Sequence, residues 1–264
     1  MNFIQTENTP LISQYRSTLY SQFTGTLDGM WQDLYIASAS TFLIEINEIS
    51  IGYCCIDDSK SLLQIFLNKE SNYLMENTLK ALISKNLITS ARLSTIEPVS
   101  FNASLGLANS VDKNTLCFQY SGSSLLKKSA LEIQLATVDD ADNIRAFFKE
   151  NAGFEDTFGY ADNLINRKEL YLSKKDNIII ATGECRLSDT QKEAADIGMI
   201  VNKGYRKQGL GTRMLDALAQ KAIALNRQPV CSTTVDNIAS KKAIEKAGFY
   251  CSNIIFDMSF KNEY

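Results

Sequence analysis

The chain contains no histidine in 264 residues. This absence excludes any mechanism that needs a Ser-His or Cys-His pair, and any metal site with histidine ligands. Reactive groups must therefore come from Asp, Glu, Lys, Tyr, Ser or Cys, from the backbone, or from water. Only 3 prolines and 13 glycines are present, which argues against long unstructured linkers. The 45% hydrophobic and 22% charged residues are typical of a globular protein.

Signals for nucleic acid, membrane and export are also missing. The net charge is −3, so the chain lacks the basic excess of most nucleic-acid-binding proteins. No hydrophobic run reaches the ~18 residues of a membrane span. The first ten residues, MNFIQTENTP, do not resemble a signal peptide. We therefore expect a cytoplasmic protein that binds neither nucleic acid nor membrane, with oligomer formation left open.

The cysteines form no C-x-x-C motif. They are Cys54, Cys55, Cys117, Cys185, Cys231 and Cys251. Most lie in apolar, strand-like runs, where a free thiol behaves as a small hydrophobic residue. Without histidine, a zinc site would need four thiolates or carboxylates from scattered positions. We expect reduced, buried cysteines and no metal cofactor.

A short polar segment divides the chain into two halves. Residues 121–129 read SGSSLLKKS, which is typical of a linker. The second half predicts, in chain order, a strand over 131–135, helices from 139 and over 160–167, strands over 170–173, 178–186 and 195–201, a helix over 209–225, a strand over 230–235, a helix over 238–247 and a strand over 253–260. The first half predicts helices over 11–23 and 27–39, strands over 41–46, 49–55 and 62–67, a helix over 72–86, a strand over 91–95, a helix over 98–107 and a strand over 116–120.

The predicted helices and strands follow much the same order in both halves. We therefore expect two domains, residues 1–125 and 129–264, related by tandem duplication. The fold class is α/β, with a mixed sheet of the α+β kind in each domain. The alternative is one α/β domain whose halves merely share common units.

The most informative stretch is a strand that runs into a glycine-containing loop and then a helix. Residues 199–212 read MIVNKGYRKQGLGT, in which Arg206, Gly209 and Gly211 form R-x-x-G-x-G. Glycines let a ligand approach the backbone, and the first helical turn presents unpaired N–H groups and a partial positive charge. This combination favours phosphate or pyrophosphate. The loop is neither a Walker A motif nor a Rossmann fingerprint, and an exposed arginine in a tight turn is the alternative interpretation.

A second motif follows. Residues 230–249 predict a strand, then Asn237, then a helix that ends at Gly248-Phe249. Asn237 is also a suitable helix N-cap in its own right. In this order and spacing, the two motifs together resemble the GNAT superfamily of acyl-CoA-dependent N-acetyltransferases. The resemblance covers residues 195–249 closely, and the rest of the second half by element order.

The resemblance implies a sheet that opens between the strands over 195–201 and 230–235 and holds acetyl-CoA in the gap. The backbone of Met199, Ile200 and Val201 would pair with the pantetheine amides, and the Val201 N–H would stabilise the oxyanion.

Further cofactor-binding residues follow from the same resemblance. The pyrophosphate would lie against the loop and first helical turn, formed by Arg206, Lys207, Gln208, Gly209, Leu210, Gly211 and Thr212. Asn237 would bond the pantetheine arm, with Ser240 nearby. Lys241, Lys242 and Arg213 are either contacts of the nucleotide phosphates or solvated helix charges.

The family reaction is direct attack of a neutral amine on the thioester, assisted by a base and in some members by an acid. This sequence departs from the common pattern at two positions. Ile244 replaces the Tyr that many members carry seven residues after the asparagine, and Ser232 replaces the Glu that some carry five residues before it. A thiol of pKa ~8.5 is a good leaving group, so a dedicated acid is not essential.

Replacement groups must come from elsewhere in the second half. We take Glu184, Asp196 and Tyr205 as the catalytic candidates. Asp236, Tyr250 and Cys231 are weaker ones. For each of them, a structural or surface role is the alternative.

The first half has no matching loop. Residues 68–73 read NKESNY, with no glycine and with Glu70 where a pyrophosphate would lie. Residues 94–101 lack the asparagine that leads the corresponding helix. We infer a degenerate GNAT-like domain that does not bind CoA. Trp31, Tyr35 and Phe42 either wall the acceptor site or pack in the core.

The leading hypothesis is an acyltransferase that moves an acetyl group from acetyl-CoA to an amine on a small molecule, peptide or protein. Two alternatives stay open: a non-catalytic acyl-CoA sensor, and an interaction protein on an inherited scaffold. CoA binding separates the third hypothesis from the first two. Thiol release in the presence of an amine separates the first from the second.

Overall fold

The computed structural model describes residues 1–7, 9–122 and 131–261. Most of the expected linker therefore lies outside the described residues. The chain forms two compact units. Unit 1 comprises Met1–Leu116 and the chain from Asn253 onward, and unit 2 comprises Cys117–Ser252. These units differ from the expected domains 1–125 and 129–264, because the last strand of the second half belongs to unit 1.

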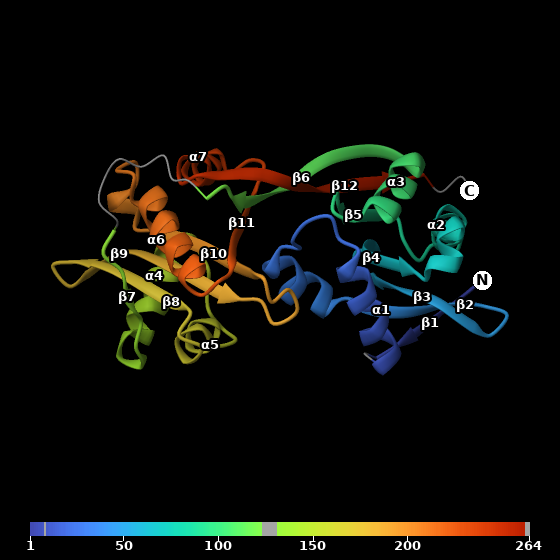
Figure 1. The fold of residues 1–264 in the computed structure, drawn as a ribbon, viewed down its shortest axis with the longest axis horizontal. Coiled ribbons are helices and arrows are strands. Elements are labelled where there is room, and N and C mark those ends of the chain that lie inside the picture. The colour runs from blue at the N-terminus through green and yellow to red at the C-terminus, as the bar shows by residue number, and fades with distance from the viewer. Residues whose placement is uncertain (8, 123–130, 262–264) are drawn as a thin grey trace. The chain divides into compact units, whose positions relative to one another are not determined.

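Unit 1 is built on a mixed sheet (Figure 1). Its elements are β1 (Asn2–Thr6), α1 (Pro10–Ser21), a π-helical turn η1 (Trp31–Ile36), β2 (Ser40–Ile46), β3 (Ile49–Ile56), β4 (Ser61–Leu67), a 3₁₀ segment η2 (Lys69–Leu74), α2 (Met75–Ser84), β5 (Ser90–Ser94), α3 (Pro98–Leu107), and most of β6 (Ala108–Tyr120) and β12 (Phe249–Phe260). Its strand order is β1-β2-β3-β4-β5-β12-β6. β4 and β5 are parallel, whereas β1 to β4 pair antiparallel in sequence order.

Unit 2 repeats the central part of this order. Its elements are β7 (Gln134–Leu135), a 3₁₀ turn η3 (Val138–Asp140), α4 (Ala141–Ala152), α5 (Tyr160–Asn166), β8 (Leu170–Lys175), β9 (Ile178–Leu187), β10 (Ala194–Val201), a 3₁₀ turn η4 (Lys203–Tyr205), α6 (Leu210–Ala224), β11 (Gln228–Thr234) and α7 (Ile238–Lys246). The strand order is β6-β11-β10-β9-β8-β7. β10 and β11 are parallel, and β7 to β10 pair antiparallel in sequence order.

Each unit contains a hairpin with the same two-residue turn. Asn47 and Glu48 join β2 to β3 with φ values of 51° and 65°. Asp176 and Asn177 join β8 to β9 with φ values of 50° and 63°. Two successive positive φ values are typical of a type I′ turn, whose twist matches that of the flanking strands. Strands were expected on both sides of each of these turns.

Helices cover both faces of the sheet in unit 2. α4 and α5 form one hydrophobic cluster with β8, in which Ile144, Phe148 and Leu172 are buried. α6 packs on the opposite face, where a Cβ added to Gly183 of β9 would lie 2.7 Å from Leu218 and from Met214. Figure 1 shows α6 above and α5 below strands β8–β10. The first turn of α6 is thereby held at the end of β10.

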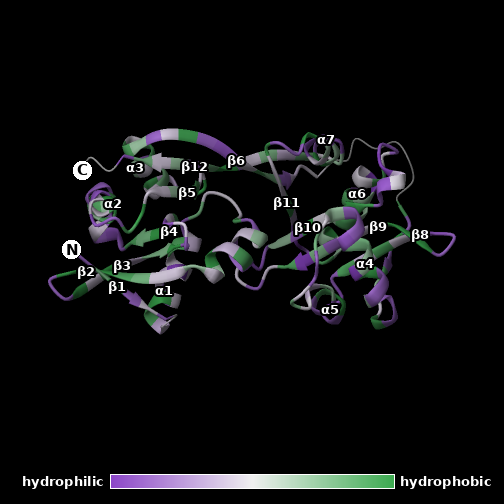
Figure 2. Cartoon of the chain, turned by 180° about the vertical axis from the view of Figure 1, so that it is seen from behind, coloured by the Kyte–Doolittle hydropathy of each residue, from purple (hydrophilic) through white to green (hydrophobic). Residues whose placement is uncertain are grey.

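The core of unit 1 lies between α2 and the strands. Met75, Leu79, Leu82 and Ile83 of α2 are buried in one cluster with residues of β2 to β5 and β12. β3 carries mostly hydrophobic residues (Figure 2). None of the helices in the described part of the chain is long and apolar enough to cross a membrane. None of the six cysteines, all within the described residues, forms a disulfide, and only Cys251 is exposed.

Most expected elements are present, with differences at the exposed ones. β1 was not expected, and β6 and β12 begin earlier than predicted, because these segments carry polar residues without clear alternation. Only Gln134 and Leu135 of the expected strand over 131–135 form β7. The helix expected over 27–39 is centred on η1. The helix expected over 209–225 ends at Ala224, and Leu225 beyond it is 52% exposed.

Close strand packing in unit 1 depends on Gly52. A Cβ on Gly52 would lie 2.0 Å from the Phe66 carbonyl oxygen of β4, so the strands would have to separate. We expect Gly52→Ala to lower the free energy of unfolding by at least about 2–3 kcal/mol. The matched control is Gly106→Ala on α3, where no described atom lies within 4 Å of the new Cβ. It should stabilise by about 0.5–1 kcal/mol. Urea denaturation of both variants measures this, and equal effects would contradict it.

Candidate functional site

The candidate site begins where β10 and β11 part. The two parallel strands pair at Ala194↔Gln228, Ala195↔Pro229 and Asp196↔Val230, and the ladder ends there. β10 continues to pair with β9 on its other side as far as Val201↔Ala181. From Ile197 onward, the edge of β10 that faces β11 therefore has no strand partner. Met199, Ile200 and Val201 lie on this segment and are half-buried.

A loop with two left-handed residues joins β10 to α6. Lys207 has a φ of 61° and Gly209 a φ of 78°, and Gly209 is the N-cap of α6. The amides in the first turn of a helix lack intrahelical acceptors, and the helix dipole adds partial positive charge there. Lys207, Gln208 and Gly209 are exposed, so this end of α6 is open to a ligand.

The two glycines of the loop serve different purposes. No described atom lies within 4 Å of a Cβ added to Gly209, whose need for glycine comes from its positive φ. A Cβ added to Gly211 would lie 3.1 Å from Cε of Met199, so Gly211 lets α6 approach β10. Of the other expected residues, Leu210 and Thr212 are buried in the first turn of α6.

Arg206 holds the loop in place. Its Nη2 donates to the Asn151 carbonyl oxygen at 2.6 Å, and its Nε donates to the Val201 carbonyl oxygen at 3.2 Å. These bonds tie the loop to the end of α4 and to the end of β10. Arg206 was expected to bind cofactor directly, but the structure gives these two donor atoms a positioning role.

Asn151 supports the same loop and was not identified from the sequence. It is 4% exposed near the end of α4. Its Oδ1 accepts from the Lys203 N–H at 2.8 Å, and its Nδ2 donates to the Phe147 carbonyl oxygen at 3.0 Å. A buried asparagine must find such partners, but the sequence could not show that one of them, Lys203, lies 52 residues downstream.

Asn237 is the N-cap of α7, as its position predicted. Its Oδ1 accepts from the Ser240 N–H at 3.1 Å. The Nδ2 group takes no part in that bond. Asn237 is exposed and Ser240 is half-buried. Both residues follow β11, the strand on the other side of the opening.

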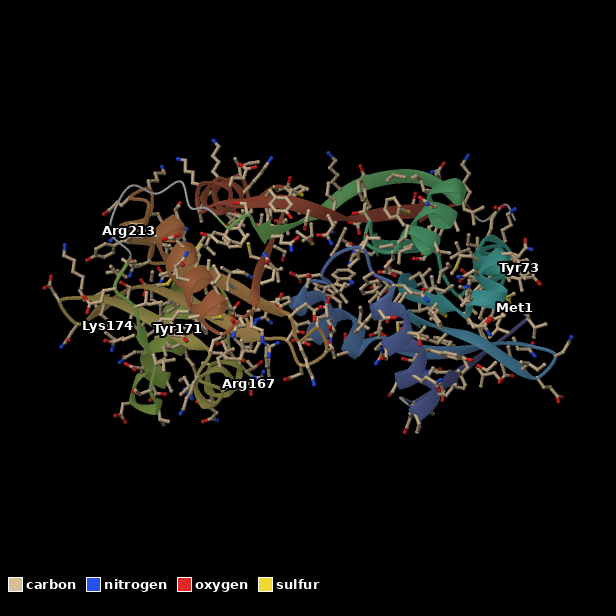
Figure 3. The ribbon with its side chains drawn as sticks, in the orientation of Figure 1. Met1, Tyr73, Arg167, Tyr171, Lys174 and Arg213 are labelled. Carbon is tan, nitrogen blue, oxygen red and sulfur yellow. The ribbon has the colours of Figure 1, made fainter. Side chains whose placement is uncertain are left out.

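The three cations near the expected nucleotide site differ in their surroundings. Arg213, labelled in Figure 3, lies on α6, and its buried Nε has no hydrogen-bond partner among the described residues. Lys241 lies 3.9 Å from Glu245 on the same helix, and Lys242 is exposed. Lys241 and Lys242 therefore fit solvated helix charges, whereas Arg213 retains an unused donor.

Glu184 lies at the opening itself. It pairs across the ladder with Gly198 on β10, and a Cβ on Gly198 would be 2.5 Å from Glu184 Oε1. The missing Cβ therefore leaves room for this carboxylate to reach across β10. The Tyr160 hydroxyl of α5 donates a short hydrogen bond to Glu184 Oε2, and Arg186 Nε lies 3.8 Å from that oxygen. The Glu184 side chain is 21% exposed, so it can meet both a ligand and water.

The other two catalytic candidates lie farther from the open edge. Asp196 is 5% exposed and sits in the last paired position of the β10–β11 ladder. It shares the sheet face of Glu184 because alternate strand residues point the same way. Tyr205 ends η4 in the loop and is half-buried. The structure thus brings Glu184 and Asp196 onto one face, with Tyr205 beyond the end of β10.

The weaker candidates fit structural roles. Tyr250 is 50% exposed and donates to Gln119 Oε1 at 3.1 Å, while Asp236 is exposed. Cys231 is buried on β11, and Ile244 is 3% exposed in the core. Ser232 is half-buried. Burial raises the pKa of Cys185, beside Glu184 on β9, to about 12, so this thiol is protonated at neutral pH and is no nucleophile.

Unit 1 has a different loop at the corresponding position. η2 follows β4 without a glycine, and Glu70 is exposed in it. Trp31 is 5% exposed and stacks on Tyr35 with ring centroids 4.6 Å apart, and Phe42 packs on the core. Core packing therefore describes Trp31 and Phe42, whereas Tyr35 is 46% exposed.

Comparison with known proteins agrees with this geometry. A model of the acetyltransferase (GNAT) domain matches residues 8–121, and a model of the acetyltransferase (GNAT) family matches residues 129–249. A solved acetyltransferase from the GNAT family of Colwellia psychrerythraea is 30% identical over 99% of this chain and 100% of that chain, with a TM-score of 0.94. The chain belongs to the GNAT acetyltransferase family.

Two more distant structures share the tandem GNAT fold. A GCN5-related N-acetyltransferase from Sphaerobacter thermophilus is 11% identical over 98% of this chain and 95% of that chain, with a TM-score of 0.63. A tandem GNAT protein from the clavulanic acid biosynthesis pathway is 12% identical over 98% of both chains, with a TM-score of 0.59. None of the curated proteins compared with the chain matches it. The expected α/β fold of two tandem GNAT domains is confirmed.

The anchoring role of Asn151 predicts a local effect on the loop of this GNAT protein. Asn151→Ala removes the acceptor of the Lys203 N–H. We expect amide exchange at Lys203 to accelerate and acetyl-CoA to bind about tenfold more weakly. Glu150→Ala changes the neighbouring exposed residue on α4 and serves as the control. Hydrogen exchange by NMR and calorimetric titration measure the two effects. Unchanged Lys203 exchange in Asn151→Ala would contradict the assigned role.

Proposed function

We propose that this GNAT protein is an acetyl-CoA-dependent N-acetyltransferase whose chemistry takes place in unit 2. The observation that carries the proposal is the early end of the β10–β11 ladder. It lies beside the first turn of α6, whose N–H groups donate no hydrogen bond to a capping side chain because the N-cap is Gly209. An open backbone edge and a helix N-terminus together suit an extended amide-containing arm that ends in a pyrophosphate.

The residues of unit 2 fit the parts of acetyl-CoA. The open edge of β10, from Met199 to Val201, would pair with the pantetheine amides. The amides from Lys207 to Thr212 would bind the pyrophosphate, and the unused Nε of Arg213 would meet a phosphate. Asn237 and Ser240 would border the pantetheine arm from the β11 side. Arg206 would not have to move when the ligand binds, because its guanidinium group already donates to the carbonyl oxygens of Val201 and Asn151.

Glu184 is the proposed general base. A neutral amine nitrogen attacks the thioester carbonyl, its proton passes to Glu184 directly or through a water, and the C–S bond breaks to release the thiolate. The Tyr160 hydroxyl would hold Glu184 in position over Gly198. The Val201 N–H would stabilise the oxyanion. Tyr205 and Asp196 remain candidates for supporting roles in the same step.

An isosteric pair at Gly209 tests the binding half of this proposal. Asn and Asp both tolerate a left-handed φ and differ only in charge. We expect Gly209→Asp to weaken acetyl-CoA at least about tenfold relative to Gly209→Asn, because a carboxylate would repel the pyrophosphate at the end of α6. Calorimetric titration gives both affinities, with one site per chain expected. Equal affinities would place the pyrophosphate elsewhere.

Substitution of Glu184 tests the catalytic half. Glu184→Gln removes the base while keeping the size of the side chain. We expect kcat to fall about 10²–10⁴-fold with acetyl-CoA affinity unchanged. Release of CoA thiol with a panel of primary amines measures the rate. Tyr160→Phe should lower kcat less, since it removes only the bond that positions Glu184. Full activity of Glu184→Gln would rule this base out.

The same assays separate the alternative function. The buried Ile244 and the half-buried Ser232 stand where other members carry an acid and a base. Acetyl-CoA binding without thiol release for any amine would favour an acyl-CoA sensor over an enzyme. Failure to bind acetyl-CoA would exclude both the enzyme and the sensor, and would leave the hypothesis of an interaction protein on an inherited scaffold.

A further inference from the structure

Unit 1 contains a pocket where its own parallel strands part. β4 pairs with β5 only at Ser61↔Ser90 and Leu62↔Ala91. Beyond this point the pocket, which is partly open to solvent, lies between the ends of α1, β4, α2 and α3. Most of its lining is apolar, including Phe23, Phe66 and Met75. The opening corresponds to the one between β10 and β11 in unit 2.

Glu97 occupies the position in unit 1 that Asn237 occupies in unit 2. Each is the N-cap of the helix that follows the second parallel strand, with ψ values of 69° and 67°. The Glu97 N–H donates to the carbonyl oxygen three residues earlier at 3.1 Å, and the Asn237 N–H does the same at 3.1 Å. At the equivalent backbone position, unit 1 therefore carries the carboxyl group of Glu97 and unit 2 the carboxamide of Asn237.

The Glu97 carboxyl is buried and lines the pocket. Glu97 is 4% exposed, whereas Asn237 is exposed. The Ser100 hydroxyl lies 3.4 Å from Glu97 Oε2, a long hydrogen bond. The described residues that line the pocket include no lysine or arginine. A buried carboxylate needs a cation or several donors to stay ionised, and burial raises the pKa of Glu97 to about 8.

We propose that this pocket binds a small organic cation, with its ammonium group on the Glu97 carboxylate and its apolar body against Phe23, Phe66 and Met75. A cation carried by the ligand supplies the charge partner that the lining lacks. Acetyl-CoA does not fit here, because Glu70 and the glycine-free η2 replace the phosphate loop. The proposal concerns unit 1 alone and does not depend on the chemistry of unit 2.

Binding should be coupled to loss of a proton. At pH 7 Glu97 is mostly protonated, so pairing with an ammonium group releases its proton to solvent. The apparent Kd should therefore fall about tenfold per unit of pH up to about pH 8, and then level off.

Neighbouring groups do not titrate in this range. Two titratable groups interact with Glu97: Tyr20 on α1 and Cys55 on β3. Burial raises the pKa of Tyr20 to about 12 and that of Cys55 above its usual 9.0. Arg16 on α1, which contacts Cys55, stays charged because its pKa is raised. The lining residues of β4, α2 and α3 supply no other titratable side chain among those described.

Methionine methyl NMR of the full chain can test the proposal, because the two units report separately. Met75 lines the pocket of unit 1, and Met199 lies on the open edge of β10 in unit 2. We expect 2-phenylethylamine to shift the Met75 signal in a saturable way at pH 8. The neutral analogue 2-phenylethanol should bind at least about tenfold more weakly. Acetyl-CoA should shift Met199 and leave Met75 in place.

Two variants complete the test. Glu97→Gln keeps the shape of the side chain and should weaken amine binding at least about tenfold, with its pH dependence lost. Glu70→Gln removes an exposed carboxylate of η2 and should leave amine binding unchanged. Equal binding of amine and alcohol, unchanged amine affinity in Glu97→Gln, no shift of Met75 with the amine, or a Met75 shift with acetyl-CoA would each overturn the proposal. Failure of acetyl-CoA to shift Met199 would count against the proposed function alone.

Discussion

A parallel strand pair that ends after three residues is the feature on which the site in unit 2 depends. Backbone N–H and C=O groups on a strand normally find partners in the next strand, so an edge left open inside a unit must be satisfied in another way. β9 pairs with β10 on one side as far as Val201, so that only the other edge of β10 is open. α6 then begins directly beyond this edge. The open edge, the loop and the first turn of α6 therefore follow one another directly along the chain.

The two units share the same backbone arrangement around the opening and differ in a few side chains beside it. Both keep a type I′ hairpin, a parallel pair that parts early, and a helix that is separated from the second parallel strand by three residues. They differ in the segment after the first parallel strand, which carries Gly209 in unit 2 and none of the glycines in unit 1. They differ again at Asn237 and Glu97. These two differences between the units both lie beside the openings of the parallel strand pairs.

Much of this could be predicted from the sequence, because hydrophobic periodicity marks buried elements. α3 was predicted at its observed bounds, and the strands of both hairpins were predicted on either side of their turns. β1 and the first half of β6 were missed because exposed strands need not alternate in hydrophobicity. The motif led to Gly209 and Asn237 because local spacing carries their role. Asn151, Tyr160 and the burial of Glu97 depend on contacts between distant segments, which a single sequence does not record.

The path of the last strand has a consequence for the evolution of the chain. β12 leaves Gly248 in unit 2 and ends in unit 1, where Ile255 to Ser259 pair with β5. β6 makes the opposite passage, from unit 1 at Ala108 to unit 2 at Tyr120. Unit 1 is therefore not a continuous stretch of the sequence, because Cys117–Ser252 of unit 2 interrupts it. A deletion of the first half of the chain would also remove Cys117–Tyr120 of β6 from unit 2. Selection for one half can thus preserve the other.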